Sequence, residues 1–214
     1  MTESTRVRDD ICRIAKSIFD RGLTCGASGN ISVRLSDGSY IVTPTGSSMG
    51  FLDPARISHL DQNMRHLSGD KPTKETPLHS AFYDTRPQTG AVIHLHSTYA
   101  VALSMLPDTD PDNALPALTP YAIMRLGKVK LLPFFLPGDA AMGAAIRDLA
   151  GTRSAVLLAN HGPVVAEKDL WTATYAMEEF EETAKLAVLL KGAQPNVLSD
   201  AEIQAVVRKF HVDG

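Results

Sequence analysis

Short apolar segments of β-type pattern alternate along this chain with longer segments of helical pattern, and this alternation restricts the possible fold most. Helical spacing, caps and glycine stops predict helices over residues 5–22, 75–84, 98–105, 138–150 and 169–191, and a last helix from the capping box at 199–202. Strand patterns occupy residues 31–35, 40–43, 91–96, 130–136, 155–159 and 163–166. Prolines and aspartates predict an irregular loop over 107–120. Because tight turns join several strands, we expect a mixed sheet with helices on both faces.

The composition argues against several classes of protein. The 214 residues contain no repeat or linker, so we expect one domain over 1–214. Lys and Arg number 21 against 24 Asp and Glu, a formal charge of −3 without a basic cluster, which argues against nucleic-acid binding. No apolar run approaches the roughly 18 residues that cross a bilayer, and the polar N-terminus lacks the apolar segment of a secretory signal. With only Cys12 and Cys25, we expect reduced thiols and a cytoplasmic protein.

Two histidines, His94 and His96, stand one residue apart in a predicted strand. Alternate side chains of a strand point to the same face, so both imidazoles can bind one small cation; the alternative is a pair of core or surface histidines. A third, His161, follows the apolar run 155–159, where a buried strand meets a turn. Three imidazoles and one open position suit a divalent ion that keeps its Lewis acidity. Taken alone, His161 could instead be a turn residue that tolerates unusual backbone angles.

One acidic residue, Glu75, stands at the start of a predicted helix. A carboxylate at this place ordinarily compensates the helix dipole. His79, four residues on, would be its neighbour on the helix surface. The local sequence alone therefore assigns Glu75 no chemical role.

Two loops rich in small residues, 25–32 and 43–48, are suited to bind an anion. Glycines let backbone N–H groups approach a phosphate closely, and Ser28, Asn30 and Thr45 add polar side chains. Either loop could also be a plain turn. Neither loop contains the P-loop pattern or the glycine pattern of dinucleotide-binding folds, so the sequence does not predict nucleotide binding of those types.

Five motifs occur together along the chain. They are Ser28-Gly29-Asn30-Ile31-Ser32, Thr43-Pro44-Thr45-Gly46, Glu75, His94-Leu95-His96 and Asn160-His161-Gly162. With these motifs the chain resembles the class II aldolase and adducin-head family from its first helix through Lys191. The resemblance implies an α/β fold, a three-layer α/β/α sandwich with a central, mostly antiparallel sheet. It also implies a homotetramer with active sites between subunits and one divalent cation per subunit, usually Zn²⁺, with Mn²⁺ or Co²⁺ as alternatives.

The resemblance also implies roles for individual residues. The cation would be held by His94, His96 and His161, while Glu75 approaches it in the empty site and acts as acid and base when substrate binds. The implied phosphate contacts are Ser28, Gly29, Asn30, Thr45 and Gly46. Where the aldolases tend to have two serines, this chain has Thr73 and Lys74. Thr73 keeps a hydroxyl, and Lys74 either contacts a phosphate or carboxylate or points to solvent.

Tyr121 matches a tyrosine that in the aldolases reaches a neighbouring subunit's site as a proton donor. A phenol with a pKa of about 10 keeps its proton at neutral pH, so it can donate. The alternative is an amphipathic tyrosine that merely packs at an interface.

Longer phrases, among them GDKPTKETPLH, HLHSTYAVALSMLP and LLANHGPVVAEKDLW, are most similar to family members that decarboxylate 3-oxo-tetronate 4-phosphates. The resemblance therefore implies a metal-dependent carbon–carbon lyase that converts this phosphorylated sugar acid to dihydroxyacetone phosphate and carbon dioxide through an enediolate. A sugar-phosphate aldolase of the fuculose-1-phosphate type leaves the same enediolate, so the shared motifs do not separate the two reactions. Further alternatives are a methylthioribulose-phosphate dehydratase and a non-catalytic binding module like the adducin head.

Overall fold

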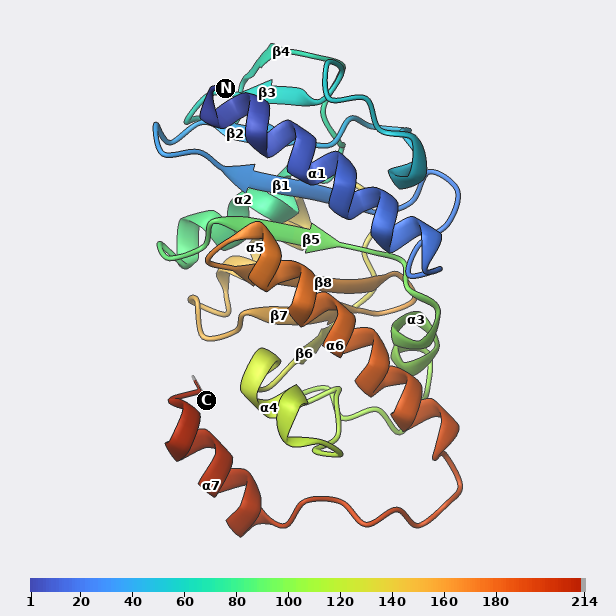
Figure 1. Ribbon diagram of the computed structural model, residues 1–214. Helices are drawn as coiled ribbons and strands as arrows, with labels where there is room; N and C mark the ends of the chain where they lie inside the picture. Colours follow the sequence, from blue (N-terminus) through green and yellow to red (C-terminus); the bar gives the residue numbers. More distant parts are fainter. Residues whose placement is uncertain (213–214) are drawn as a thin grey trace.

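The middle layer of the structure is one eight-stranded sheet with the order β4-β3-β2-β1-β5-β8-β7-β6 (Figure 1). This computed structural model describes residues 1–212 of the chain. The strands are β1 (Asn30–Arg34), β2 (Tyr40–Val42), β3 (Ser58–Leu60), β4 (His66–Ser68), β5 (Ala91–His94), β6 (Lys130–Leu132), β7 (Ala155–Leu158) and β8 (Gly162–Glu167). Every neighbouring pair is antiparallel except β6 and β7, so the sheet is mostly antiparallel, as predicted.

Seven α-helices and one short 3-10 helix accompany the sheet in residues 1–212. They are α1 (Glu3–Asp20), η1 (Met49–Phe51), α2 (Thr76–Thr85), α3 (Thr98–Ser104), α4 (Pro120–Leu126), α5 (Ala140–Arg147), α6 (Leu170–Leu189) and α7 (Asp200–Phe210). The predicted caps are present at Asp169 and in the capping box of Ser199 and Glu202. None of these helices combines the length and the apolar character that crossing a membrane requires.

Helices cover both faces of the sheet, because alternate strand residues supply two separate cores. On one face α1, α3 and α6 pack over residues such as Ile31 and Ile93, and Figure 1 shows α1 and α6 crossing this face. On the other face α2 and α5 pack over residues such as Val92 and Val164. The predicted three-layer α/β/α arrangement is confirmed.

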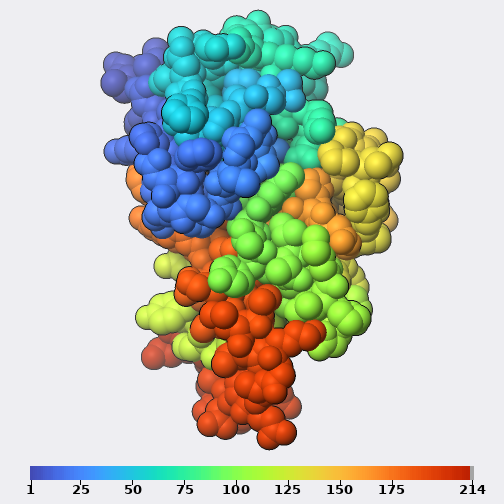
Figure 2. Space-filling view, turned by 90° about the vertical axis from the view of Figure 1, so that its right-hand side faces the viewer, coloured from blue at the N-terminus to red at the C-terminus, as the bar shows by residue number. Residues whose placement is uncertain are grey.

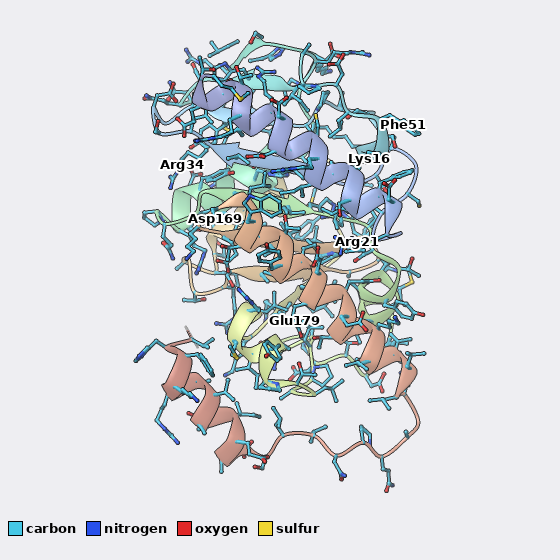
Figure 3. All side chains as sticks on the ribbon, viewed as in Figure 1. Lys16, Arg21, Arg34, Phe51, Asp169 and Glu179 are labelled. Atoms are coloured by element: carbon cyan, nitrogen blue, oxygen red, sulfur yellow. The ribbon has the colours of Figure 1, made fainter. Side chains whose placement is uncertain are left out.

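Contacts between helices tie the first face together. Arg21, which follows α1, pairs with Glu178 of α6, and Figure 3 shows Arg21 between these two helices. The hydroxyl of Thr119, which caps α4, donates a 3.3 Å hydrogen bond to Glu179 of α6. The last helix, α7, has no buried residue and packs against α4. Figure 2 shows the orange-red segment that follows α6 at the lower end of the molecule, with the blue to teal N-terminal third of the chain at the other end.

Two features of the sheet differ from the sequence prediction. The strand predicted over 91–96 ends at His94, although the Leu95 N–H still donates to the Pro163 carbonyl oxygen at 3.2 Å. The strands β3 and β4 are not predicted by the sequence pattern, since three residues are too few to show an alternation.

The segment before β7 also differs from its prediction. The strand predicted over 130–136 ends at Leu132, because Pro133 has no N–H to continue the ladder. The predicted loop over 107–120 is irregular up to α4, a helix that the pattern does not predict. The helix predicted over 138–150 is shorter, and α5 begins only after the cap at Asp139.

Candidate metal and active site

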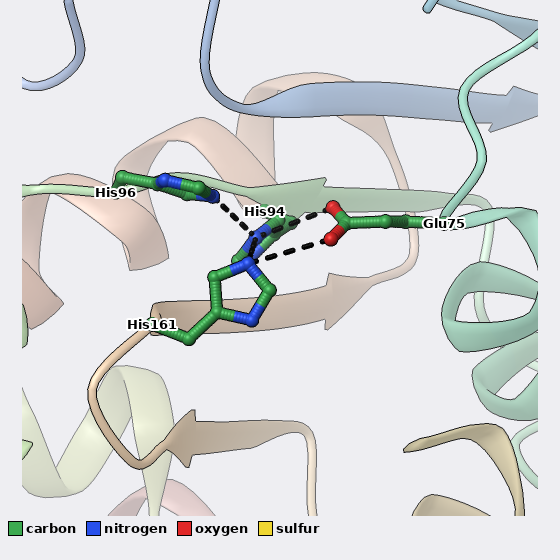
Figure 4. A group of neighbouring side chains, drawn as sticks. All are labelled: Glu75, His94, His96 and His161. Atoms are coloured by element: carbon green, nitrogen blue, oxygen red, sulfur yellow. Dashed lines mark hydrogen bonds and ion pairs between the residues drawn. The ribbon is translucent and has the colours of Figure 1, made fainter. Parts of the chain in front are cut away.

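Four side chains, Glu75, His94, His96 and His161, converge where the sheet meets the N-terminus of α2 (Figure 4). One ligand atom of each residue lies within 4.8 Å of those of the others. Glu75, His94 and His161 are buried, and His96 is partly exposed. The fold therefore brings together the predicted residues from three distant parts of the sequence.

The pairing of β5 with β8 places the histidines. His94 ends β5 opposite Val164, and it lies on the same face as Val92, which is the face toward α2. His161 stands in the turn between β7 and β8. In that turn it is Asn160 that has a positive φ, +57°, so tolerance of unusual backbone angles does not explain the histidine.

The ring nitrogens of the three histidines face one another. His94 Nδ1 lies 2.9 Å from the Pro163 carbonyl oxygen, so this nitrogen carries a proton and donates it. Its Nε2, unprotonated in the neutral ring, lies 3.1 Å from His96 Nε2 and 3.3 Å from His161 Nε2. Burial lowers the pKa of His94 to about 3, so the ring is neutral at neutral pH. Nitrogen atoms this close need a proton or a cation between them, which fits a divalent ion on three imidazoles.

The Glu75 carboxylate completes this cluster. Its oxygens lie 3.4 Å from His94 Nε2 and 3.4 Å from His161 Nε2, and Oε2 accepts a 2.7 Å hydrogen bond from the Asn30 amide. Burial favours the protonated form, but the hydrogen bonds from His161 and Asn30 and the electrostatic effect of the adjacent His94 imidazole outweigh it and hold the pKa of Glu75 well below its usual range. A carboxylate and three imidazoles form a ligand set suited to a dication such as zinc.

The first predicted anion loop lies directly beside the histidines. Gly29 has a φ of +84°, and a Cβ built on it would lie 3.0 Å from the His94 carbonyl oxygen. Glycine is therefore required if this loop is to approach the strand so closely. The Ser28 hydroxyl donates to the Cys25 carbonyl oxygen at 2.6 Å, so it binds within the loop, where the resemblance implies a phosphate contact.

The Asn30 side chain also has protein partners where the resemblance implies a phosphate contact. Its Nδ2 donates to Glu75, and its Oδ1 is hydrogen bonded to His79 Nε2. His79 Nδ1 contacts the Ser32 hydroxyl, which contacts the hydroxyl of Tyr83. Sequence reasoning identified His79 only as a helical neighbour of Glu75, and it missed Ser32 and Tyr83. Spacings of four along the helix and two along the strand were the available signals.

The second predicted anion loop borders a cavity of about 230 Å³, which Thr45 and Gly46 help to line. The Thr73 N–H donates to the Thr43 carbonyl oxygen at 3.1 Å, and this bond ties the loop to the segment before α2. The Thr73 hydroxyl accepts a 3.3 Å hydrogen bond from the Glu75 N–H. Thr73 therefore connects the second loop to the backbone of Glu75.

Lys74 and Tyr121 are placed differently from each other. Lys74 is exposed, and its charge contributes, after burial and the charge of His161, to lowering the pKa of His96. Tyr121 lies on α4 with 59% of its surface exposed, and it makes no hydrogen bond or ring contact with the four clustered side chains within residues 1–212.

Comparison with known proteins identifies the family. The description of the class II aldolase and adducin N-terminal domain matches residues 9–188, which is most of the chain. The chain therefore belongs to the class II aldolase and adducin N-terminal domain family.

Individual relatives fall into two groups. A 3-oxo-tetronate 4-phosphate decarboxylase from Escherichia coli K12 is 46% identical over 197 residues, which cover 92% of this chain and 93% of that protein. An L-fuculose phosphate aldolase from the same organism is 32% identical, with 94% of this chain and 96% of that protein covered. The crystal structure of YgbL from Escherichia coli superposes with a TM-score of 0.93 at 43% identity, covering 96% of this chain and 99% of that one.

Proposed function

We propose that this protein is a metal-dependent carbon–carbon lyase that decarboxylates a 3-oxo-tetronate 4-phosphate to dihydroxyacetone phosphate and carbon dioxide. The observation that carries the proposal is the cluster of Glu75, His94, His96 and His161 beside a glycine loop. The 46% identity to a decarboxylase of this substrate favours the particular reaction.

The three histidines and Glu75 are the proposed ligands of one divalent cation, for which we propose Zn²⁺. The fit depends on neutral rings: burial keeps His94 neutral, and the Pro163 carbonyl holds its proton on Nδ1, which leaves Nε2 free. When bound, the cation supplies Lewis acidity that stabilises negative charge on the substrate oxygens.

The substrate phosphate is proposed to bind at the two loops. Backbone N–H groups near Gly29 and Gly46 suit an anion, since glycine allows close approach at both positive-φ positions. Thr45 and Thr73 add hydroxyls, and Lys74, an exposed residue directly before Glu75, adds a cation. The phosphate would fix the remaining carbons of the substrate toward the histidines.

The proposed reaction also requires that residues of this protein transfer one proton to the substrate. Loss of carbon dioxide leaves an electron pair at C2 that is shared with the C3 carbonyl as an enediolate, and one proton at C2 completes the product. Glu75 is proposed to deliver that proton after taking it from water, because its resting carboxylate is ionised. Tyr121, exposed on α4, is the second proposed donor and would serve a neighbouring copy in a homotetramer with sites between subunits.

A sugar-phosphate aldolase is the second candidate, since an L-fuculose phosphate aldolase is 32% identical over nearly the whole chain. Both reactions would use the same cluster and differ only in the departing group.

We propose a cytoplasmic location, where Cys12 and Cys25 would stay reduced.

The test is a comparison of substrates with identification of products. Zinc-loaded protein is incubated with 3-oxo-tetronate 4-phosphates and, separately, with ketose 1-phosphates, and carbon dioxide, dihydroxyacetone phosphate and aldehydes are measured. We expect carbon dioxide and dihydroxyacetone phosphate in equal amounts from the first substrates. Aldehyde release from ketose 1-phosphates, without decarboxylation, would establish the aldolase reaction instead.

A further inference from the structure

Beneath the cluster, a row of polar side chains on α2 meets a row on β1. Glu75, His79 and Tyr83 follow one another at intervals of four residues, and Asn30 and Ser32 are two residues apart on the strand. Four residues of helix rise about 6 Å, and two residues of strand rise about 6.6–6.8 Å. The two rows therefore stay in register, and the side chains from the helix side and from the strand alternate along the contact.

Four hydrogen bonds link these five side chains in one continuous series. Asn30 Nδ2 bonds to Glu75 Oε2 at 2.7 Å, and Asn30 Oδ1 bonds to His79 Nε2. His79 Nδ1 lies 2.7 Å from Ser32 Oγ, which lies 2.8 Å from Tyr83 Oη. All five residues are buried, with exposed fractions of 5% or less: Asn30, Ser32, Glu75, His79 and Tyr83. Water therefore has little access to replace any of these partners.

The donor and acceptor properties of these five groups fix the position of every proton in the hydrogen-bonded series. The Glu75 carboxylate can only accept, so the Asn30 NH₂ donates to it and the Asn30 oxygen must face His79. That oxygen can only accept, so His79 Nε2 carries the proton and His79 Nδ1 must accept. Ser32 therefore donates to His79, and Tyr83 donates to Ser32. In each of the four hydrogen bonds, the donor is the residue farther from the Glu75 carboxylate and the acceptor is the nearer one.

From this order we infer that His79 and Ser32 are positioning residues, which fix the amide orientation of Asn30 and through it the direction of the Glu75 carboxylate. The inference rests on the proposed role of Glu75 in the metal and acid–base site. If Asn30 turned by half a rotation, its oxygen would face the carboxylate and the hydrogen bond would be lost. The His79 N–H makes this orientation unfavourable, because it would then face an NH₂ group.

The surroundings of the row favour the same arrangement. Burial lowers the pKa of His79 to about 4, and the opposing effect of the Glu75 charge is smaller, so the ring stays neutral with one proton. At the far end, Arg34 stacks over the Tyr83 ring at 5.6 Å, and the Tyr40 ring lies 4.8 Å from it. These contacts hold the Tyr83 phenol, the first donor in the series, against Ser32.

The first test observes the proton positions directly. Protein labelled with ¹⁵N-histidine is studied by long-range ¹H–¹⁵N NMR, with and without zinc, and the His79 signals are identified by their absence in His79→Gln. We expect the neutral ring with its proton on Nε2 in both samples at neutral pH. A proton on Nδ1, or a charged ring, would overturn the inference.

The second test removes one donor and keeps the fold. Ser32→Ala deletes the hydroxyl that donates to His79 Nδ1, and we expect zinc affinity to weaken by about 10-fold, the lower end of the effect of losing a direct partner of a metal ligand, because Ser32 acts through His79 and Asn30. We also expect kcat to fall while KM changes little. Thr174→Val is the matched control, because it removes a buried hydroxyl that binds only the Leu170 carbonyl on α6. Wild-type zinc affinity in Ser32→Ala, or an equal loss in Thr174→Val, would contradict the inference.

The two proposals can fail separately. Zinc affinity and the His79 proton position do not depend on which substrate the enzyme uses. A wild-type protein that releases no carbon dioxide would disprove the proposed reaction. The expected NMR spectrum and the expected zinc affinities of Ser32→Ala and Thr174→Val would still support the positioning role of His79 and Ser32.

Discussion

Gly162 lies so close to Leu95 that a Cβ built on the glycine would stand 2.2 Å from the leucine carbonyl oxygen. This contact joins the start of β8 to the residue that separates His94 from His96, and Gly162 itself follows His161. The close approach therefore brings all three histidines into one place, and their geometry depends on a position where no side chain fits.

Gly162→Ala should damage both stability and metal binding. The methyl group would collide with backbone atoms, and the φ of +150° is unfavourable for alanine, so we expect a loss of at least about 2 kcal/mol in the free energy of unfolding. Denaturant unfolding measures it. Gly192→Ala is the control, because its φ is also positive but nothing lies within 4 Å, and about 1 kcal/mol is expected. Equal losses in the two variants would show that the contact with Leu95 has no special importance.

Glu75→Gln should separate catalysis from metal binding. Glutamine can still accept the Asn30 hydrogen bond through its oxygen, so the site keeps its shape and much of its zinc. It cannot exchange a proton, and we expect kcat to fall by about 10²–10⁴-fold. The measurement is steady-state kinetics beside metal analysis of the same sample. Full activity would remove Glu75 from the acid–base role.

Thr45→Val should mainly raise KM. Valine keeps the shape of threonine but lacks the hydroxyl proposed to contact the substrate phosphate, and a hydrogen bond to a charged group contributes about 1.5–3 kcal/mol. We therefore expect KM to rise by about 10–100-fold with kcat nearly constant. Phosphate should also inhibit the variant more weakly than the wild type. An unchanged KM would place the phosphate elsewhere.

The two cysteines should differ in their reaction with iodoacetamide. Burial, with smaller contributions from nearby carboxylates, raises the pKa of Cys12 to about 11, so at pH 8 only about 0.1% of this thiol is ionised. Cys25 is exposed and should react first, while the Cys12 rate should rise steeply as the pH approaches 11. Mass spectrometry of the alkylated peptides gives both rates. Fast labelling of Cys12 at pH 8 would show that its thiol is not protected by burial.

Much of the site could be predicted because simple periodicities place it. A strand's two-residue repeat puts His94 and His96 on one face, and a strand end puts His161 at a turn. The partners of Asn30 could not be predicted, because the orientation of its amide depends on how closely α2 packs on β1. The helix α4 was also not predicted from the sequence, because its seven residues are too few to show a clear period; Thr119 as the cap and Pro120 at the first helical position were the available signals.

The central claim is that Glu75 and the three histidines form a centre for one divalent cation. Anomalous scattering at the zinc edge from crystals of the zinc-loaded protein tests it most directly, with His161→Ala crystals as the control. We predict one strong peak per chain, about 2.0–2.1 Å from the Nε2 atoms of His94, His96 and His161, and its loss together with enzyme activity in His161→Ala. A peak elsewhere, or none among these rings, would contradict the account.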